Sequence, residues 1–379
     1  MFFEVLLRKE EVNLRELIRI VSIVGARPQF IKAAVISRSI SRYNQRSQCN
    51  IDELIIHTGQ HYDDNLSRVF FEELDIPRPD YDLEVGSSSH GRQTGLMLEG
   101  IERVLEEQKP DFVVVYGDTN STLAGALAAA KLHIPVAHVE AGLRSFNRKM
   151  AEEINRVVAD HVSDILLCPT KLAVDNLANE GIKRGVHQVG DVMYDSMLYY
   201  SKMAESLEDN VLKKLCVEKG SYYLATIHRA ENTDDRKRLW QIIEGLNAVS
   251  EKYPVILPLH PRTIGFVDKY GLRFSERISV IEPVSYLEMA ALEKNSRLIL
   301  TDSGGVQKEA YFLGVGCVTL RNETEWSELV DCGWNRLAGA DRDTIVKSAT
   351  EAEKLSKMGK ESFYGDGNAG EKIVDILTG

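Results

Sequence analysis

The sequence has no long apolar run, no closely paired cysteines and no excess of positive charge. Its 46 Lys and Arg residues are outnumbered by 57 Asp and Glu, and the formal net charge of −11 argues against a nucleic-acid partner, although it leaves room for a local basic cleft that holds a phosphate. No apolar stretch approaches the about 18 residues of a membrane-spanning helix, so we expect no membrane partner. The five cysteines are scattered without a Cys-x-x-Cys pair, which predicts a cytoplasmic protein without a zinc site.

Two nucleotide-binding signatures are absent as well. The first apolar run ends in Gly25-Ala26-Arg27, which does not fit the Gly-x-Gly-x-x-Gly fingerprint of dinucleotide-binding domains. No glycine-rich loop ends in the Gly-Lys-Ser/Thr of a Walker motif. An NAD-dependent dehydrogenase is therefore disfavoured.

Apolar runs and amphipathic segments alternate along the whole chain. The expected strands are 19–25, 53–59, 112–118, 135–142 and 164–170 in the first half, and 222–228, 254–261, 278–283, 297–304 and 316–321 in the second. Because helical patterns such as 94–107 separate them, we predict an α/β fold with parallel, doubly wound sheets.

A chain of 379 residues is long enough for two domains. We expect an N-terminal domain over 1–187, in which 1–18 form an extra helix or a disordered extension that is neither a signal peptide nor an anchor. A C-terminal domain is expected over 188–365, and a C-terminal helix over 366–379 is expected to pack back on the N-terminal domain. Two such domains leave a cleft between them, where we expect the active site.

Ionisable or glycine-rich residues follow nearly every expected strand, and ligands of parallel sheets bind at these carboxyl ends. Arg27 and Lys32 follow the first strand, and His228-Arg229 follow the first strand of the second half. Together these cations could hold a diphosphate, with Arg suited to bidentate contact and Lys to point-charge contact. A single histidine in such a place can also be an ordinary packing residue.

Ser303-Gly304-Gly305 precede an expected helix and form a candidate phosphate cradle. Glycines let backbone N–H groups approach an anion, and the helix N-terminus adds a favourable dipole. The alternative is a plain helix cap at Asp302 or Ser303 with a tight turn.

Asp118, Glu140 and Glu152 are the candidate catalytic acids. Carboxylates that crowd in a partly desolvated site acquire different pKa values, so one can act as a base and another as an acid. The alternative role of Asp118 is the N-cap of the following helix. Glu152 could be a first-turn helix carboxylate, beside a surface pair of Glu153 and Arg156.

Seven motifs in order resemble the non-hydrolysing UDP-N-acetylglucosamine 2-epimerases, over roughly residues 19–375. They are GARPQFIK (25–32), GDTNSTLAGALAA (117–129), HVEAGLRS (138–145), AEEINR (151–156), IHRAEN (227–232), PLHPRT (258–263) and LTDSGGVQKEA (300–310).

The resemblance implies two Rossmann-like domains arranged as in GT-B glycosyltransferases, with a UDP-sugar in the interdomain cleft and the UDP held by the C-terminal domain. It implies an isomerase that interconverts UDP-N-acetylglucosamine and UDP-N-acetylmannosamine. UDP is eliminated across C1–C2 to give 2-acetamidoglucal and is then added back. No cofactor or metal is needed, and a homodimer that supplies cell-surface polysaccharide synthesis in the cytoplasm is expected.

The resemblance also assigns roles by motif position. Asp118, Glu140 and Glu152 would be catalytic acids, and His228 would support the departing UDP. The substrate-binding residues would be Arg27, Lys32, Arg229, Ser303, Gly304 and Gly305 at phosphate or carboxylate groups, and Glu309 at the ribose hydroxyls.

Some segments depart from the family pattern. Trp326 stands where many members have an arginine, Ala151 replaces a proline, and 59–67 keeps Gln60 and His61 but not the rest of a regulatory UDP-sugar site. SFNRKMA (145–151) looks closer to relatives that epimerise diacetamido uronates or 6-deoxy sugars. A GT-B glycosyltransferase, a hydrolysing epimerase and a non-catalytic UDP-sugar sensor stay as alternatives.

Overall fold

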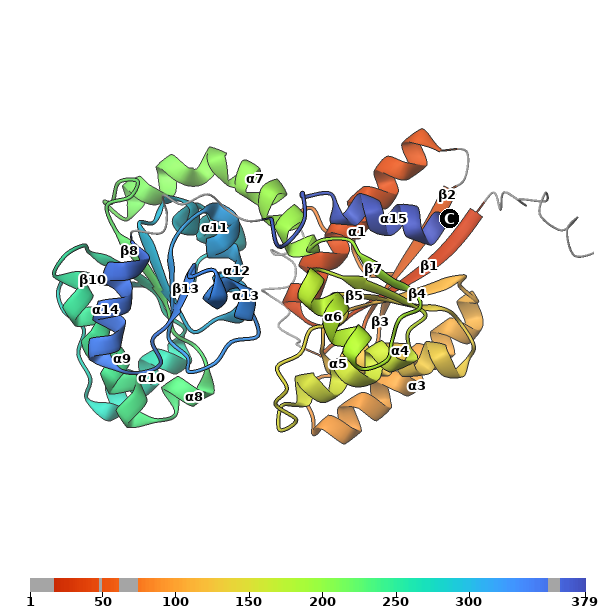
Figure 1. The fold of residues 1–379 in the computed structure, drawn as a ribbon, viewed down its shortest axis with the longest axis horizontal. Coiled ribbons are helices and arrows are strands. Elements are labelled where there is room, and N and C mark those ends of the chain that lie inside the picture. The colour runs from red at the N-terminus through yellow and green to blue at the C-terminus, as the bar shows by residue number, and fades with distance from the viewer. Residues whose placement is uncertain (1–16, 48–49, 61–73, 354–361) are drawn as a thin grey trace, which may run out of the picture. The chain divides into compact units, whose positions relative to one another are not determined.

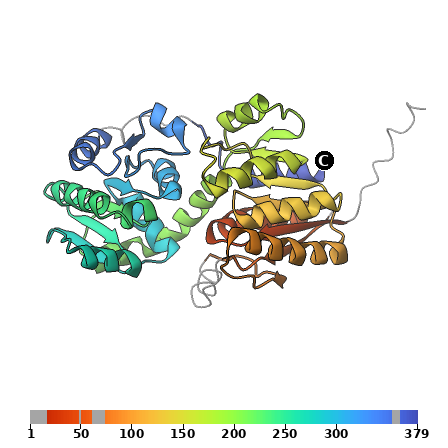
Figure 2. The ribbon, with the colours of Figure 1, turned by 90° about the horizontal axis from the view of Figure 1, so that it is seen from below.

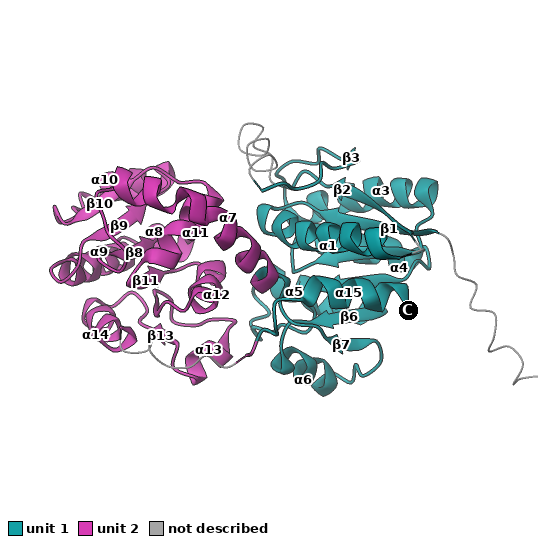
Figure 3. Cartoon of the chain, turned by 90° about the horizontal axis from the view of Figure 1, so that it is seen from above, with its two compact units in different colours: residues 1–193, 364–379 teal, residues 194–363 magenta. Residues whose placement is uncertain are grey.

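The computed structural model describes residues 17–47, 50–60, 74–353 and 362–379. The chain divides into two compact units, with unit 1 comprising Met1–Met193 and Tyr364–Gly379 and unit 2 comprising Tyr194–Phe363 (Figure 3). Most of the expected N-terminal extension, and the part of the Gln60-His61 region from residue 61 onward, lie outside the described residues.

Unit 1 is built on a seven-stranded sheet with the order β3-β2-β1-β4-β5-β6-β7, in which all neighbours are parallel. Its strands are β1 (Leu17–Val24), β2 (Asn50–His57), β3 (Tyr81–Asp82), β4 (Phe112–Tyr116), β5 (Val136–Val139), β6 (Ile165–Cys168) and β7 (Val186–Gln188). Its helices are α1 (Arg27–Arg46), α3 (His90–Gln108), α4 (Asn120–Lys131), α5 (Ala151–Val162), α6 (Lys171–Asn179) and α15 (Ala369–Thr378).

Helices cover both faces of this sheet. α1 and α15 pack against each other on one face (Figure 1), and α3, α4 and α5 lie side by side on the other (Figure 2). β4 has the sequence FVVVY, whose branched side chains suit a strand that is buried on both faces. In α4, four buried alanines and Gly125 allow close packing, because a Cβ at Gly125 would lie 2.7 Å from Ile23 Cδ1.

Unit 2 repeats the design with a six-stranded sheet in the order β10-β9-β8-β11-β12-β13, again with parallel neighbours. Its strands are β8 (Tyr223–Thr226), β9 (Val255–Pro258), β10 (Ile278–Ile281), β11 (Leu298–Thr301), β12 (Cys317–Thr319) and β13 (Asn335–Leu337). Its helices are α8 (Ala230–Thr233), α9 (Arg236–Ser250), α10 (Pro261–Tyr270), α11 (Tyr286–Asn295), α12 (Gly304–Leu313), α13 (Ser327–Asp331) and α14 (Arg342–Ala352), and α7 (Val192–Lys214) leads into the unit from unit 1.

The predicted architecture of two parallel, doubly wound α/β sheets is confirmed. In both sheets the strand order reverses beside the first strand of the unit, between β1 and β4 and between β8 and β11. Ligands of doubly wound sheets bind at the carboxyl ends of the strands at such switch points. The fold therefore directs attention to the loops that follow these four strands.

Over the described ranges, no helix is long and apolar enough to cross a membrane. Within the same ranges, no group of three or more His, Cys, Asp or Glu side chains is arranged to hold a metal ion.

Candidate functional site

A buried ion pair lies at the switch point of unit 1. Lys32, in the second turn of α1, pairs through Nζ with Oε2 of Glu140, which directly follows β5. Each of these residues is only 8% exposed. Breaking a buried ion pair is costly, so the pair fixes both side chains at the carboxyl end of the sheet.

The backbone around this pair is unusual at two positions. A Cβ at Gly117, which has φ +64°, would lie 3.1 Å from Lys32 Nζ and 3.4 Å from Glu140 Oε2, so the glycine lets both charged groups approach the chain. Glu140 itself has φ +73°, a left-handed conformation that costs a non-glycine residue about 1–2 kcal/mol. Such strain is typical of functional positions, where the surrounding structure holds the residue in place.

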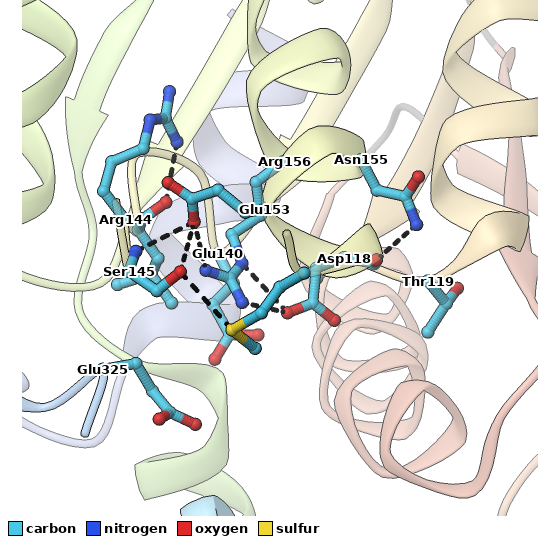
Figure 4. A network of polar contacts seen from close by, with 12 residues as sticks. Asp118, Thr119, Glu140, Arg144, Ser145, Glu153, Asn155, Arg156 and Glu325 are labelled. Carbon is cyan, nitrogen blue, oxygen red and sulfur yellow. Dashed lines mark hydrogen bonds and ion pairs between the residues drawn. The ribbon is translucent and has the colours of Figure 1, made fainter. Parts of the chain in front are cut away.

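Asp118 follows Gly117, and its Oδ2 accepts a hydrogen bond from Arg156 Nε at 3.0 Å (Figure 4). Burial raises the pKa of Asp118, the charges of Arg156 and Lys32 oppose the rise, and the Glu140 carboxylate adds to it. Since 36% of its side chain is exposed, water limits the rise. A carboxylate with a moderately raised pKa is a better base near neutral pH than an ordinary aspartate.

The alternative role of Asp118 as a helix cap is wrong. The N-cap of α4 is Thr119, whose side chain accepts from the Thr122 N–H. The Asp118 carbonyl oxygen instead accepts from Asn155 Nδ2 at 2.9 Å, which ties the turn to α5. The Asp118 carboxylate is therefore not used as a helix cap and pairs with Arg156.

Arg156 and Glu153 of α5 do not form a surface pair, because both are buried. Arg156 Nη1 donates to Glu153 Oε2 at 2.9 Å, while the same guanidinium holds Asp118. Glu153 also accepts from the N–H of Ser145 and of Phe146, each at 2.9 Å. Burial alone would raise the pKa of Glu153, but the Ser145 hydrogen bonds and the Arg156 charge lower it, so Glu153 is an anion that anchors the loop after Arg144.

Glu152 lies on the exposed side of α5. Among the described residues, its carboxylate has no hydrogen-bond or ion-pair partner. The two neighbouring acids therefore differ in role. Glu153 anchors the loop after Arg144, whereas the Glu152 carboxylate is accessible to a ligand.

A second buried network holds the turn at Gly117 and Asp118 in place. His138 of β5 hydrogen-bonds the Gly117 carbonyl oxygen through Nε2 and Asp160 through Nδ1, both at 2.7 Å. Asp160 also accepts from Arg144 Nη1 at 2.7 Å, and Arg144 pairs with Glu180 through Nε at 2.7 Å. Burial opposes ionisation of Asp160, but His138 and Arg144 lower its pKa below the ordinary value.

The loop after β1 is joined to the loop after β4 by Gln29. Its side chain accepts from the Gly25 N–H at 2.8 Å and donates to the Tyr116 carbonyl oxygen at 2.7 Å. Arg27, the first residue of α1, is exposed just beside this turn. The structure therefore brings Lys32, Asp118 and Glu140 together, and places Arg27 at the rim of the same strand ends.

In unit 2, the fully buried Asp302 organises the switch point. It accepts hydrogen bonds from the N–H groups of His228 and Arg229, at 3.1 Å each, and from Asn232 Nδ2 at 3.1 Å. His228 Nδ1 lies 3.2 Å from Asp302 Oδ1, and the histidine side chain is 54% exposed. Burial would raise the pKa of Asp302, but His228, Asn232 and the Arg229 N–H lower it, so Asp302 is an anion that aims His228 outward.

The start of α12 has the form of an anion cradle. Ser303 is its N-cap and accepts from the Val306 N–H at 3.4 Å, so the cap and cradle interpretations are compatible. A Cβ at Gly304 would lie 2.4 Å from Glu325 Oε1, so a larger residue there would require the Glu325 carboxylate to move. Arg229 Nη2 lies 3.9 Å from the same carboxylate oxygen.

Trp326, which departs from the family pattern, packs on the start of α12. Its indole Nε1 donates to the Gly304 carbonyl oxygen at 3.0 Å, and Lys308 Nζ lies 4.1 Å from the ring centroid. The residue therefore fixes the first turn of α12 from outside, through packing and one hydrogen bond.

Glu309 lies on the buried side of α12, where Tyr286 Oη donates to its Oε1 at 3.4 Å. Burial raises the pKa of Glu309 to about 7, against the opposing effects of Lys308, Tyr286 and Glu293. A carboxylate at this depth is a strong acceptor for hydroxyl groups when it is ionised.

We expect Asp302→Asn to destabilise unit 2 by about 2 kcal/mol, because an amide offers one oxygen where the carboxylate serves several donors. All three tryptophans (Trp240, Trp326 and Trp334) belong to unit 2, so tryptophan fluorescence in urea measures this unfolding. Because the pKa of Asp302 is lower in the native state than in the unfolded state, its ionised form stabilises the fold at pH values above the unfolded pKa of about 3.9. This stabilisation is lost as the pH falls through the native pKa of Asp302. The wild type should therefore lose its stability advantage over Asp302→Asn in acid. Asp268→Asn, at an exposed position, is the control and should be as stable as the wild type. Equal stability of Asp302→Asn and the wild type at neutral pH would refute the role of Asp302.

Sequence reasoning missed Arg156, Glu153 and Asp302 as members of the site. The first two lie three residues apart on one face of α5, with Asp160 four residues beyond Arg156. This spacing, together with the buried Ala159, is the signal that charges lie on an inward helix face.

Comparisons with known proteins agree on one family. A family model described as UDP-N-acetylglucosamine 2-epimerase matches residues 44–378. The chain is 53% identical to a UDP-N-acetylglucosamine 2-epimerase homolog of Methanococcus maripaludis, with 95% of this chain and 99% of the relative covered. It is 52% identical to the UDP-2,3-diacetamido-2,3-dideoxy-D-glucuronate 2-epimerase of Pseudomonas aeruginosa, with the same coverage. The structure of the Methanocaldococcus jannaschii UDP-GlcNAc 2-epimerase in complex with UDP-GlcNAc and UDP is similar, with a TM-score of 0.83, 46% identity, and 96% and 99% of the two chains covered.

Proposed function

Because the chain belongs to the UDP-N-acetylglucosamine 2-epimerase family, we propose that it interconverts UDP-N-acetylglucosamine and UDP-N-acetylmannosamine. One observation carries the proposal for this chain: Lys32, Asp118 and Glu140 lie in one network at the switch point of unit 1, in the motifs that resemble the family. A site that must remove a weakly acidic proton from carbon needs such positioned carboxylates.

In the proposed reaction, a carboxylate takes the proton from C2 of the sugar. The electrons of that C–H bond form the C1=C2 double bond of 2-acetamidoglucal, while the C1–O bond breaks and its electron pair leaves with UDP. Return of a proton to the opposite face of C2, with UDP added back at C1, gives the epimer. Asp118, Glu140 and Glu152 are the proposed acids, and Lys32 orients Glu140.

The proposed residues for the leaving group come from unit 2. His228 is held outward by Asp302, and Arg229, Ser303, Gly304 and Gly305 offer a cation, a hydroxyl and backbone N–H groups to the diphosphate. Arg27 of unit 1 is proposed to contact phosphate, and Glu309 to accept from the ribose hydroxyls. Donors that meet the charge growing on UDP lower the barrier to C1–O cleavage.

The wider setting is proposed from the family as well. We expect a cytoplasmic homodimer that supplies a sugar nucleotide to cell-surface polysaccharide synthesis. Size-exclusion chromatography with light scattering tests the oligomeric state.

A modified sugar is the second candidate substrate. The 52% identity to the Pseudomonas aeruginosa diacetamido-glucuronate epimerase supports it, as does the SFNRKMA segment with its basic Arg148 and Lys149. A panel of UDP-sugars followed by NMR decides between the two substrates, since the preferred one should show the highest kcat/KM.

Incubation with UDP-N-acetylglucosamine in D₂O tests the reaction itself. Deuterium should appear at C2 of both epimers, because the abstracted proton exchanges with solvent before its return. Free UDP formed in proportion to product would instead indicate a hydrolysing epimerase, and a glycosylated acceptor without C2 exchange would indicate a glycosyltransferase. Binding without either change would indicate a sensor.

A further inference from the structure

One guanidinium group in unit 1 lies between two carboxylates (Figure 4). Arg156 Nε and Nη2 each lie 3.0 Å from Oδ2 of Asp118, and Arg156 Nη1 donates to Glu153 Oε2 at 2.9 Å. The side chains of Arg156 and Glu153 are 6% and 3% exposed, whereas 36% of the Asp118 side chain is exposed. Arg156 is therefore enclosed behind Asp118, and of the three groups the Asp118 carboxylate is the one that can meet a ligand.

The two carboxylate oxygens of Asp118 differ in their contacts. Both nitrogens of Arg156 that reach this residue are directed at Oδ2, and Oδ1 has no hydrogen-bond partner among the residues that the structure describes. A guanidinium is rigid and planar, so two N–H groups directed at one oxygen fix the orientation of the carboxylate. Oδ1 is consequently the oxygen that can exchange a proton with a ligand.

The backbone of the turn is held by other residues. Asn155 Nδ2 donates to the Asp118 carbonyl oxygen at 2.9 Å, and His138 Nε2 hydrogen-bonds the Gly117 carbonyl oxygen at 2.7 Å. These two bonds tie the main chain of the turn to α5 and to β5. The contacts of Arg156 therefore serve the side chain of Asp118 and not the path of the chain.

Glu153 fixes the other side of the guanidinium. Besides the bond from Arg156, its carboxylate accepts from the N–H of Ser145, the hydroxyl group of Ser145 and the N–H of Phe146, each at 2.9 Å. Because four donors converge on this buried carboxylate, the loop that begins at Ser145 sets its position. A continuous series of hydrogen bonds thus runs from this loop through Glu153 and Arg156 to Asp118.

We propose that Arg156 is a positioning residue that holds Oδ2 of Asp118 and directs Oδ1 to the proton at C2 of the sugar, with Glu153 fixing Arg156 from the loop. The inference rests on the proposed function, in which Asp118 is one of the catalytic acids. Arg156 acts through Asp118, because its side chain is buried and all three of its nitrogens already have a carboxylate partner. In the transfer, the C2 proton bonds to Oδ1, and the electrons of the C–H bond form the C1=C2 double bond.

Arg156→Lys tests this role, because lysine keeps the positive charge and loses the planar fork. We expect kcat for epimerisation to fall about 10- to 100-fold, the effect of losing one well-directed hydrogen bond to a charged group. The affinity for UDP, measured by calorimetry, should change by less than about threefold, since the proposed diphosphate contacts lie mainly in unit 2. Arg103→Lys, at an exposed position of α3, is the matched control and should keep the wild-type kcat.

A double-mutant cycle with Asp118→Asn separates positioning from a structural role. If Arg156 acts through Asp118, Arg156→Lys should lower the residual rate of Asp118→Asn by less than about twofold. Glu153→Gln should behave in the same way, with kcat about tenfold below the wild type and little further effect in the Asp118→Asn background. NMR of deuterium incorporation at C2 during long incubations measures these low rates.

The pH profile of kcat gives a readout that a merely structural role would not move. Burial raises the pKa of Asp118, the charges of Arg156 and Lys32 oppose the rise, and the Glu140 carboxylate adds to it. Arg156→Met removes an opposing charge, so this pKa should rise further. Because kcat is lost as Asp118 takes up a proton, the acid limb of the profile should move to higher pH. In Arg156→Lys the charge remains, and the limb should stay near its wild-type position.

The possible failures can be told apart. Wild-type kcat in Arg156→Lys, an equal fall of kcat in the Asp118→Asn background, or an unmoved acid limb in a folded Arg156→Met overturns the positioning role alone. If Arg156→Met does not fold, the cycle with Arg156→Lys decides. A wild type that neither interconverts the epimers nor incorporates deuterium at C2 overturns the proposed function, and the positioning role falls with it.

Discussion

Asp118→Asn and Glu140→Gln should each lower kcat for epimerisation by about 10²–10⁴-fold, the usual contribution of a positioned acid or base. An amide has nearly the shape of the carboxylate but cannot take up the proton from C2. Asp118→Asn keeps an oxygen for Arg156, and Glu140→Gln keeps one for Lys32, so the loops should stay folded. UDP affinity should change by less than about threefold, because the proposed diphosphate contacts lie mainly in unit 2.

Two measurements separate chemistry from binding. NMR of the sugar signals in D₂O reports both epimerisation and exchange at C2, and calorimetry with UDP reports binding. Asp175→Asn, an exposed acid of α6 that pairs with Lys171, is the control and should be fully active. Near-normal turnover in Asp118→Asn or Glu140→Gln would rule out the catalytic role of that residue.

Lys32→Met should destabilise unit 1 by about 3 kcal/mol, because it removes the ion-pair partner of the buried Glu140 carboxylate. The double variant Lys32→Met/Glu140→Gln removes the negative charge as well and should recover part of this loss. Lys131→Met, at the exposed end of α4, should have no measurable effect.

The two units offer separate signals for this experiment. Because the tryptophans are confined to unit 2, their fluorescence reports the unfolding of that unit. In Lys32→Met, the midpoint of this transition should stay at the urea concentration of the wild type. Far-UV circular dichroism reports both units and should show an earlier transition. A double variant that is less stable than Lys32→Met would contradict the ion-pair explanation.

Most of the fold could be predicted from the sequence because buried parallel strands appear as short continuous apolar runs. The strands that escaped prediction are β3, β7 and β13, which have two or three residues each and include the outer strands of unit 1. Two or three residues are too few to show the residue pattern of a strand. Such strands can be recognised only from their hydrogen bonds to a neighbouring strand in the folded chain.

The sequence predicted the site residues that directly follow strands, but not the buried residues that hold them in place. Asp118 and Glu140 were found because charge directly after an apolar run is informative. Arg156 and Asp302 were missed because their importance comes from what they hold, and partners distant in sequence appear only in the folded chain. Which of Glu152 and Glu153 turns inward depends on the rotation of α5, which the pair itself does not reveal.

The return of the chain to unit 1 has a consequence for biosynthesis. Strands β1–β7 are made first, but α15, which packs against α1, is made only after all of unit 2. On the ribosome, unit 2 therefore has its complete set of residues while α1 still lacks the helix that covers it (Figure 1). The face of α1 that packs on α15 is therefore completed only after unit 2 has been synthesised.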